Sequence, residues 1–260
     1  NAYHNAMKPP APLDLVTVLR LALTIFWRQF APIILLGLVF LTLPAVALRT
    51  LSIATTAAPD PALGTIAETL RWLLVMIFLC AVTGGVLART SDPRAFIRAG
   101  LSRLQPGLVV ALVIGIGLMT LRIILLLVSR LLQLGQMSSL FFVVACIAVF
   151  AVWVLAIPAA LHERQWPMVS FQRSAELTRG NRWRLSALCI FIALALTPVI
   201  MAIRFVVFHA AQTPQQVAAI VQSMTITSPA LWIVQLSTLL IYGLLSVVPV
   251  ALYLTLAGRR

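Results

Sequence analysis

The chain has 260 residues, of which 62% are apolar and 10% are charged, and its mean hydropathy is +1.05. A soluble domain is about 45–50% apolar and about 25% charged. The composition excludes a soluble enzyme, a secreted disulfide scaffold and a disordered tail, because too little polar surface is available to cover a water-soluble globule. It predicts a polytopic membrane protein.

The predicted elements follow an N-terminal tail, residues 1–12. Met7 is the expected initiator, with residues 1–6 a tag remnant or an upstream extension. No small-residue cleavage site closes a short apolar core, so we expect the first spanning helix to be retained and to direct insertion. Residues 13–260 are predicted to form a single transmembrane domain.

Six segments are long and apolar enough to span a membrane, which takes about 20 residues for ~30 Å of hydrocarbon. In chain order they are residues 30–48, 69–88, 106–130, 138–161, 184–208 and 230–256. The external loops are short. In the last of them, Thr213 and Gln216 form a capping box that predicts one short helix.

Basic residues are distributed unevenly about these spans. The chain carries 19 Lys and Arg against six Asp and Glu, for a net charge of +13, and 14 of the 19 fall on one side. The other five lie in or near the opposite ends of the spans: Arg49, Arg71, Arg122, Arg130 and Arg204. The positive-inside rule makes the richer side cytoplasmic, which predicts a bacterial inner-membrane protein with both termini inside. Because the bases flank apolar segments, anionic lipid head groups are the expected partners, and nucleic acid is not.

The odd-numbered spans begin 76–78 residues apart, and each follows a short amphipathic stretch, here called an elbow. In the first elbow, polar residues recur every three or four positions from Asp14 to Arg28. Asp92 and Pro93 predict the start of the second elbow helix, and Pro167 that of the third. The predicted fold is all-α, with six transmembrane helices arranged as three hairpins. A cytoplasmic interfacial helix precedes each hairpin, with its apolar face on the membrane.

Helix-breaking residues recur in the spans. They are Pro44, Gly115 with Gly117, and Pro198 in the odd spans, and Gly84 with Gly85, Pro158 and Pro249 in the even spans. Such residues kink helices or shape their packing, which is the expected role here. Transporters also use broken helices near mid-membrane to build substrate sites, so that alternative stays open.

Residues 170–184 read SFQRSAELTRGNRWR. This string resembles the ARS-x-LT-x-G-x-RWR signature of bacterial six-span membrane proteins. They include the YciC-like uncharacterised family and the membrane domain found beside some glycerophosphoryl diester phosphodiesterases. The resemblance extends to residues 158–164 and 26–30, and the layout agrees over most of residues 13–258. It implies a fold rather than an activity, because this family offers no catalytic residues to carry over.

The titratable residues form no catalytic or metal-binding pattern. None of the six acidic residues falls in the middle of a span, and the three His and three Cys are scattered along the chain. The motifs HExxH, CxxC, GxSxG and the P-loop are all missing. The sequence therefore predicts that the protein is not an enzyme and has no cofactor or metal site.

Two groups of residues are candidate binding sites. Arg122 is either a snorkelling side chain or a buried cation that binds a lipid phosphate or a partner's carboxylate. Arg49 and Arg204 lie near corresponding outer ends of the first and fifth spans, so convergence of the odd spans would create an outer site for lipid or another anion. The second group, at the third elbow, is expected to anchor the helix or to dock head groups or a partner: Arg173, Arg179, Arg182, Trp183 and Arg184.

These observations predict a non-catalytic inner-membrane accessory or scaffold protein. It would bind partner membrane proteins, associate with itself, or organise lipid. The alternative is a transporter or lipid-translocating protein that uses the kinked helices and Arg122. A membrane-bound enzyme of phospholipid metabolism comes third, because the chain lacks clustered titratable groups.

Overall fold

The computed structural model describes most of the chain: residues 13–54, 61–90, 92–131, 137–163, 166–209, 213, 215–217, 220 and 224–258. For residues 49–54, 61–65, 126, 129–131 and 137–139 it describes the backbone alone. Every regular element in these ranges is a helix. Six helical segments are long and apolar enough to cross a membrane: Phe30–Leu48, Ile66–Leu87, Leu104–Leu125, Leu140–Glu163, Arg182–Phe208 and Pro229–Ala257. The all-α, six-span fold is therefore confirmed, with boundaries close to the predicted ones.

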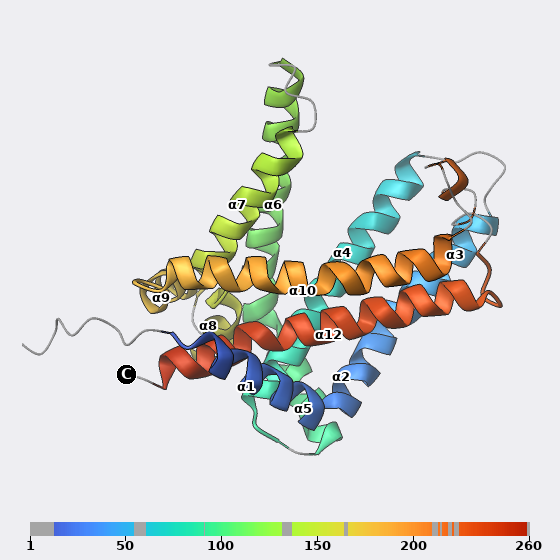
Figure 1. Ribbon diagram of the computed structural model, residues 1–260. Coiled ribbons are helices and arrows are strands. Elements are labelled where there is room, and N and C mark those ends of the chain that lie inside the picture. The colour runs from blue at the N-terminus through green and yellow to red at the C-terminus, as the bar shows by residue number, and fades with distance from the viewer. Residues whose placement is uncertain are drawn as a thin grey trace, which may run out of the picture.

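The threefold order of elbow, span and span is also confirmed (Figure 1). The first unit comprises α1 (Leu15–Arg28), then α2 (Phe30–Gly37), η2 (Leu38–Thr42) and α3 (Leu43–Ala54) as one interrupted span, then α4 (Pro61–Leu87). The second comprises α5 (Pro93–Ser102), α6 (Leu104–Leu131), and α7 (Met137–Trp153) continued by α8 (Ala156–Glu163). The third comprises α9 (Pro167–Leu177), α10 (Arg182–Phe208) and α12 (Pro229–Ala257).

The second elbow helix begins at the predicted cap, Asp92, and the first begins at Asp14, which the sequence analysis placed only on the polar face. The Asp14 carboxylate accepts hydrogen bonds from the backbone N–H of Val16 and the hydroxyl of Thr17. The Asp92 carboxylate accepts from the backbone N–H of Ala95. Each cap pairs an N–H group that the first turn of a helix leaves without a partner. The capping box between Thr213 and Gln216 is also present, with reciprocal bonds of 3.1 and 3.2 Å.

The apolar faces of the elbow helices pack on the chain's own spans, whereas the sequence placed them on the membrane. In α1, the buried side chains Val18, Ala22 and Phe26 recur every four residues. Helix α1 packs against α12, α5 against α4, and α9 against α8. Because α12 belongs to the third unit, the ends of the chain meet at this side of the molecule. The elbow helices are therefore part of the protein core.

The glycines near the end of α4 allow close packing instead of breaking the helix. Helix α4 runs without interruption through Gly84 and Gly85. A Cβ atom added to Gly100 of α5 would lie 2.3 Å from the carbonyl oxygen of Ala81, and one added to Gly85 would lie 2.5 Å from the ring of Phe96. Backbones can approach this closely only where side chains are absent.

The proline positions divide into two kinds. Pro44 follows the π-helical segment η2, and Pro158 follows a turn at Val154 that separates α7 from α8. Pro198 and Pro249 lie inside continuous helices. A proline lacks an N–H and crowds the carbonyl group four residues earlier, so a wide turn or a break just before it relieves the crowding.

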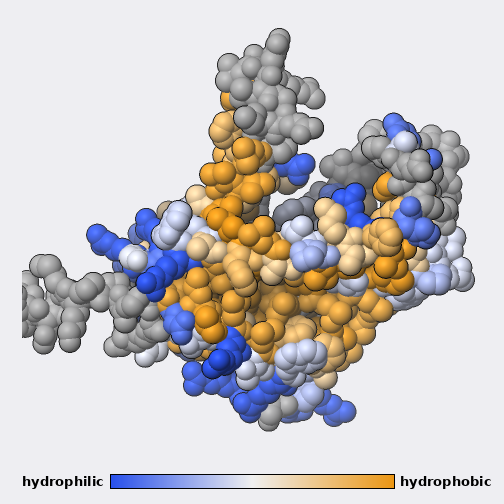
Figure 2. Space-filling view, viewed as in Figure 1, coloured by the Kyte–Doolittle hydropathy of each residue, from blue (hydrophilic) through white to orange (hydrophobic). Residues whose placement is uncertain are grey.

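The spans pack closely where the elbow helices lie, here called the elbow end, and diverge toward the opposite end, here called the far end. Helices α10 and α12 run side by side in Figure 1, and α7 crosses and packs on α10, while the upper part of the α6–α7 hairpin rises away from both. In the most apolar stretch of each helix, the share of buried residues is 56% for α12 and 50% for α4. It is only 11% for α6 and 6% for α10. Figure 2 shows the apolar surface over α10 and α12, with hydrophilic residues gathered toward α1, α5 and α9.

Candidate functional site

The third elbow consists of α9, a turn at residues 178–181 and the start of α10, and it carries the second group of candidate residues. Gly180 adopts a φ of 84° in this turn. That left-handed conformation costs glycine nothing and is typical of the residue that follows a helix. Gly180 therefore allows the chain to turn between α9 and α10.

Asn181 and Arg184 bind the backbone at the start of the first elbow. The N–H of Leu13 donates to Oδ1 of Asn181 at 3.0 Å, and Nη1 of Arg184 donates to the carbonyl oxygen of Leu13 at 2.7 Å. Leu13 is 1% exposed and Asn181 is 2% exposed. The Nδ2 of Asn181 is buried and has no partner among the described residues. This contact ties together segments 168 residues apart.

Ser174 and Thr178 contact the backbone at the helix break between α7 and α8. The Ser174 hydroxyl donates to the carbonyl oxygen of Val152 at 2.8 Å, and the Thr178 hydroxyl lies 3.5 Å from the same oxygen. Both side chains are fully buried. A break in a helix leaves carbonyl groups without their usual partners, and buried carbonyls need a donor. The hydroxyl of Ser174 on α9 and that of Thr178 just after α9 supply this donor.

Glu163 joins the end of α8 to α9 and α12. Its Oε1 accepts from Nε of Arg173 at 3.3 Å and from the hydroxyl of Tyr253 at 3.0 Å. Arg173 also lies 3.6 Å from the carboxylate of Glu176. Arg173 therefore bridges the carboxylates of Glu163 and Glu176.

The structure therefore divides the candidate docking residues into two sets. Arg173 and Arg184 are engaged in contacts within the chain. Arg179, Arg182 and Trp183 are exposed, with Trp183 83% exposed. Arg184 is exposed as well, but its Nη1 is bonded to the Leu13 carbonyl.

Three residues of the third elbow that carry structure were missed by sequence reasoning. Ser174, Thr178 and Asn181 all lie in the string that resembles a family signature, and that resemblance was the available signal. Their partners could not be inferred, because Leu13 and Val152 offer backbone atoms, which every residue has.

The first group of candidates is only partly brought together. The C-terminal part of α10, through Val207 and Phe208, packs near Val46 of α3, whereas α6 rises away from both helices (Figure 1). Arg122 is exposed on α6, with its guanidinium carbon 6.0 Å from the ring centre of Phe142 on α7. Arg204 is exposed on α10, and the Arg49 side chain lies outside the described residues. Arg122 thus makes a cation–π contact within its own hairpin.

A groove on the elbow end was not predicted from the sequence. Its volume is about 440 Å³, and it lies where the link between α5 and α6 meets the start of α9. Arg103 and the 84% exposed Trp166 contribute to its lining. A shallower depression nearby is lined by Arg94 and Arg98. These basic and aromatic side chains are suited to the head-group layer of a membrane.

The described residues include no group of three or more His, Cys, Asp or Glu side chains that could hold a metal ion. Cys80, Cys146 and Cys189 are free thiols inside the spans. The acidic residues near the third elbow are occupied by Arg173 and Tyr253. Comparisons with protein-family models, with curated proteins and with solved structures give no match.

Proposed function

We propose that the protein is a non-catalytic scaffold of a bacterial inner membrane, and that it uses the uncovered faces of α6 and α10 to bind helices of a partner. The observation that carries this proposal is the low burial of the two spans, 11% for α6 and 6% for α10. A bilayer provides no hydrophobic force that drives helices together, so association depends on close packing of surfaces. The shape of these two faces is therefore the relevant property.

Helix α6 offers a surface on which a second helix could pack closely. Around Gly115 and Gly117, no atom of the described residues outside the local backbone of α6 lies within 4 Å of the position that a Cβ would occupy. The sequence interpreted these glycines as packing or bending sites, and within the described residues nothing packs on them. Small residues at an open position of a span allow another helix to approach closely. This supports a protein partner or a second copy of the chain.

The elbow end supports an orientation with that end in the cytoplasm. Arg179, Arg182 and Trp183 are exposed there, and the groove lined by Arg103 and Trp166 lies at the same end. Basic residues are enriched on the cytoplasmic side of membrane proteins, and Trp is enriched at the interface. We propose that these residues bind anionic head groups and set the depth of the scaffold. The resemblance of residues 170–184 to a six-span family is in keeping with a structural role.

The transporter alternative has less support. It needs a solute-sized cavity near the kinked spans, but the cavity volume of the groove beside Pro44 is about 20 Å³, enough for about one water molecule. Arg122 is exposed and contacts Phe142 within one hairpin, so it does not line that space.

The test is photo-crosslinking in native membranes, with benzoylphenylalanine placed singly at Phe191, Leu194, Met201 of α10 and Met119 of α6. These positions are 55–66% exposed. The proposal expects one discrete protein adduct, formed at positions that share a helix face and weakened by Gly115→Leu. Mass spectrometry would identify it as a distinct membrane protein or a second copy.

Leu239 of α12 is the matched control, because it is 1% exposed and covered by the chain itself. Benzoylphenylalanine there should give no adduct with another protein. Lipid adducts alone at all four test positions would contradict the scaffold proposal.

A further inference from the structure

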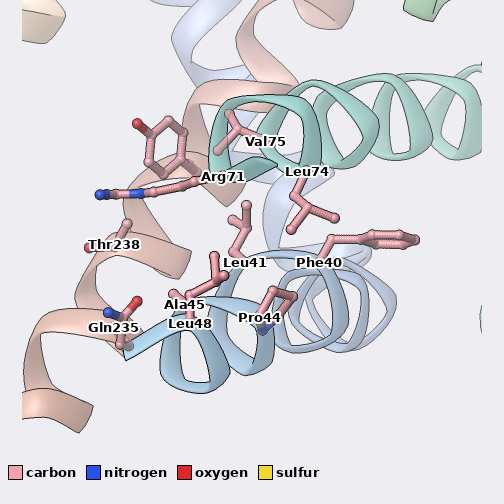
Figure 3. A pocket seen from close by; sticks show the side chains of 11 residues that line it. Phe40, Leu41, Pro44, Ala45, Leu48, Arg71, Leu74, Val75, Gln235 and Thr238 are labelled. Atoms are coloured by element: carbon pink, nitrogen blue, oxygen red, sulfur yellow. The ribbon is translucent and has the colours of Figure 1, made fainter. Parts of the chain in front are cut away.

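A groove at the far end lies between the first hairpin and α12 (Figure 3). One wall comes from the first span, a second from α4, and a third from α12. In Figure 3, Arg71 reaches from α4 toward the side of α12, where Thr238 and Gln235 lie, while Phe40 and Leu74 are at the opposite end. The groove is therefore polar at one end and apolar at the other.

The interruption of the first span accounts for the groove. The π-helical segment η2 lies just before Pro44, and both Phe40 and Leu41 of that segment line the groove. A π-helical turn is wider than an α-helical one, and a proline cannot restore the regular hydrogen-bond ladder. The local backbone thus departs from a straight helix where α4 and α12 pass. The cavity volume is about 20 Å³, so a ligand larger than a water molecule would have to lie across the mouth of the groove.

The lining is sorted by depth along the spans. Helices α4 and α12 begin at the far end, so Arg71 and Gln235 are shallow, and Val75 and Tyr242 lie about one to two turns deeper at 1.5 Å per residue. The first span runs the other way, which puts Phe40 deep. The charged and amide groups are shallow and most of the apolar groups are deep. This arrangement matches the two ends of an amphiphile that lies along the span.

Several polar side chains of the groove have hydrogen-bonding groups that no described residue occupies. Arg71 has one described ion pair, 3.9 Å from the carboxylate of Glu68, and both side chains are more than half exposed. In the part of the chain that the structure describes, the side chains of Gln235 and Tyr242 make no hydrogen bond. Positions 235, 238 and 242 share one face of α12, because they are three and four residues apart.

We propose that this groove binds one phospholipid with a zwitterionic phosphoethanolamine head group. Arg71 binds the phosphate, Gln235 and Tyr242 donate to head-group and ester oxygens, and an acyl chain lies over Phe40 and Leu74. Glu68 next to Arg71 is placed to bind the ammonium group, and it disfavours a purely anionic head group. The site deepens the lipid-binding part of the proposed function, and it does not require a partner at α6 or α10.

The test measures binding of phosphatidylethanolamine to the delipidated full chain in mild detergent by native mass spectrometry. Arg71→Gln should raise the dissociation constant of the first bound lipid at least about tenfold, since a charge-assisted bond is lost. Glu68→Gln should weaken phosphatidylethanolamine binding and strengthen phosphatidylglycerol binding. The double variant Gln235→Leu/Tyr242→Phe should lower affinity while leaving the surface charge unchanged.

Arg20→Gln is the matched control, because Arg20 is also an exposed arginine but lies on α1 at the elbow end. It should leave the first binding step unchanged. Equal binding by the wild type and Arg71→Gln would overturn the proposal, as would a wild-type preference for phosphatidylglycerol. Competition by glycerol 3-phosphate at the concentrations where the lipid binds would show a simple anion site and overturn it too. Failure of the α10 crosslinking test would leave this result unaffected.

Discussion

The elbow end and the far end of this molecule are held together differently. At the elbow end, hydrogen bonds join segments far apart in the sequence, such as the one from Leu13 to Asn181 and the one from Tyr253 to Glu163. Toward the far end, the α6–α7 hairpin is largely uncovered by the rest of the chain. Polar side chains in apolar surroundings are costly without a partner, so each satisfied bond favours one arrangement over others. The elbow end specifies the fold, and the uncovered spans leave surface for the membrane and for partners.

Glycine substitutions should show the largest contrast between the two ends. Gly100→Ala places a methyl group 2.3 Å from the backbone oxygen of Ala81, so α4 and α5 must separate. We expect a loss of about 3 kcal/mol in the free energy of unfolding. The matched change Gly115→Ala in α6 meets open space and should stabilise by about 0.5–1 kcal/mol. Unfolding in mild detergent, followed by tryptophan fluorescence, measures both. Equal effects would contradict the contrast in packing.

The contact between the third and first elbows should be next in size. Asn181→Ala leaves the buried N–H of Leu13 without its acceptor, and we expect a loss of about 2 kcal/mol. The exposed neighbour Arg182 is the control, and Arg182→Ala should change stability by less than about 0.5 kcal/mol. Thermal unfolding midpoints in one detergent compare the two. If Asn181→Ala unfolds at the wild-type temperature, the contact does not hold the ends of the chain together.

A smaller effect is expected at the helix break. Ser174→Ala removes the hydroxyl that donates to the carbonyl of Val152, and should cost about 1 kcal/mol. Thr24 makes a similar bond to the carbonyl of Arg20, but on an exposed helix face. Thr24→Ala should therefore stay within about 0.5 kcal/mol of the wild type. Hydrogen exchange of the α7–α8 backbone gives a second measurement, and unchanged protection in Ser174→Ala would speak against this role.

The smallest effect is expected at Arg122. The guanidinium is exposed, and its contact with Phe142 spans 6.0 Å, so Arg122→Gln should cost less than about 0.5 kcal/mol. Arg184→Gln, which removes the donor to the Leu13 carbonyl, should cost about 1–2 kcal/mol. The comparison uses unfolding free energies of the two purified variants. A larger loss at Arg122 would mean that the α6–α7 hairpin depends on this arginine.

Much of the fold follows from local sequence patterns. An apolar stretch of about 20 residues is a property of neighbours, and so are the caps at Asp14 and Asp92, whose side chains bond to groups two or three residues away. The candidate site was less accessible. Sequence analysis named Arg184 as a candidate docking residue of the third elbow. The group that Arg184 binds, the carbonyl of Leu13, is 171 residues away in the sequence. Backbone atoms carry no sequence signature, so no pattern could identify that partner.

The same residue type received different roles once the helices packed. The sequence grouped Gly84, Gly85 and Gly115 as residues that kink helices or shape their packing. In the structure, α4 passes through Gly84 and Gly85 without a break and α5 packs against them. Within the described chain nothing packs on Gly115. The sequence by itself determined the class of protein, the six spans, the three elbows and the Asp92 cap, because hydropathy and capping act between near neighbours. Only the tertiary structure decided which faces are covered and which cations are engaged. Many packings bury similar apolar stripes, and close backbone contacts with a few buried hydrogen bonds select one of them.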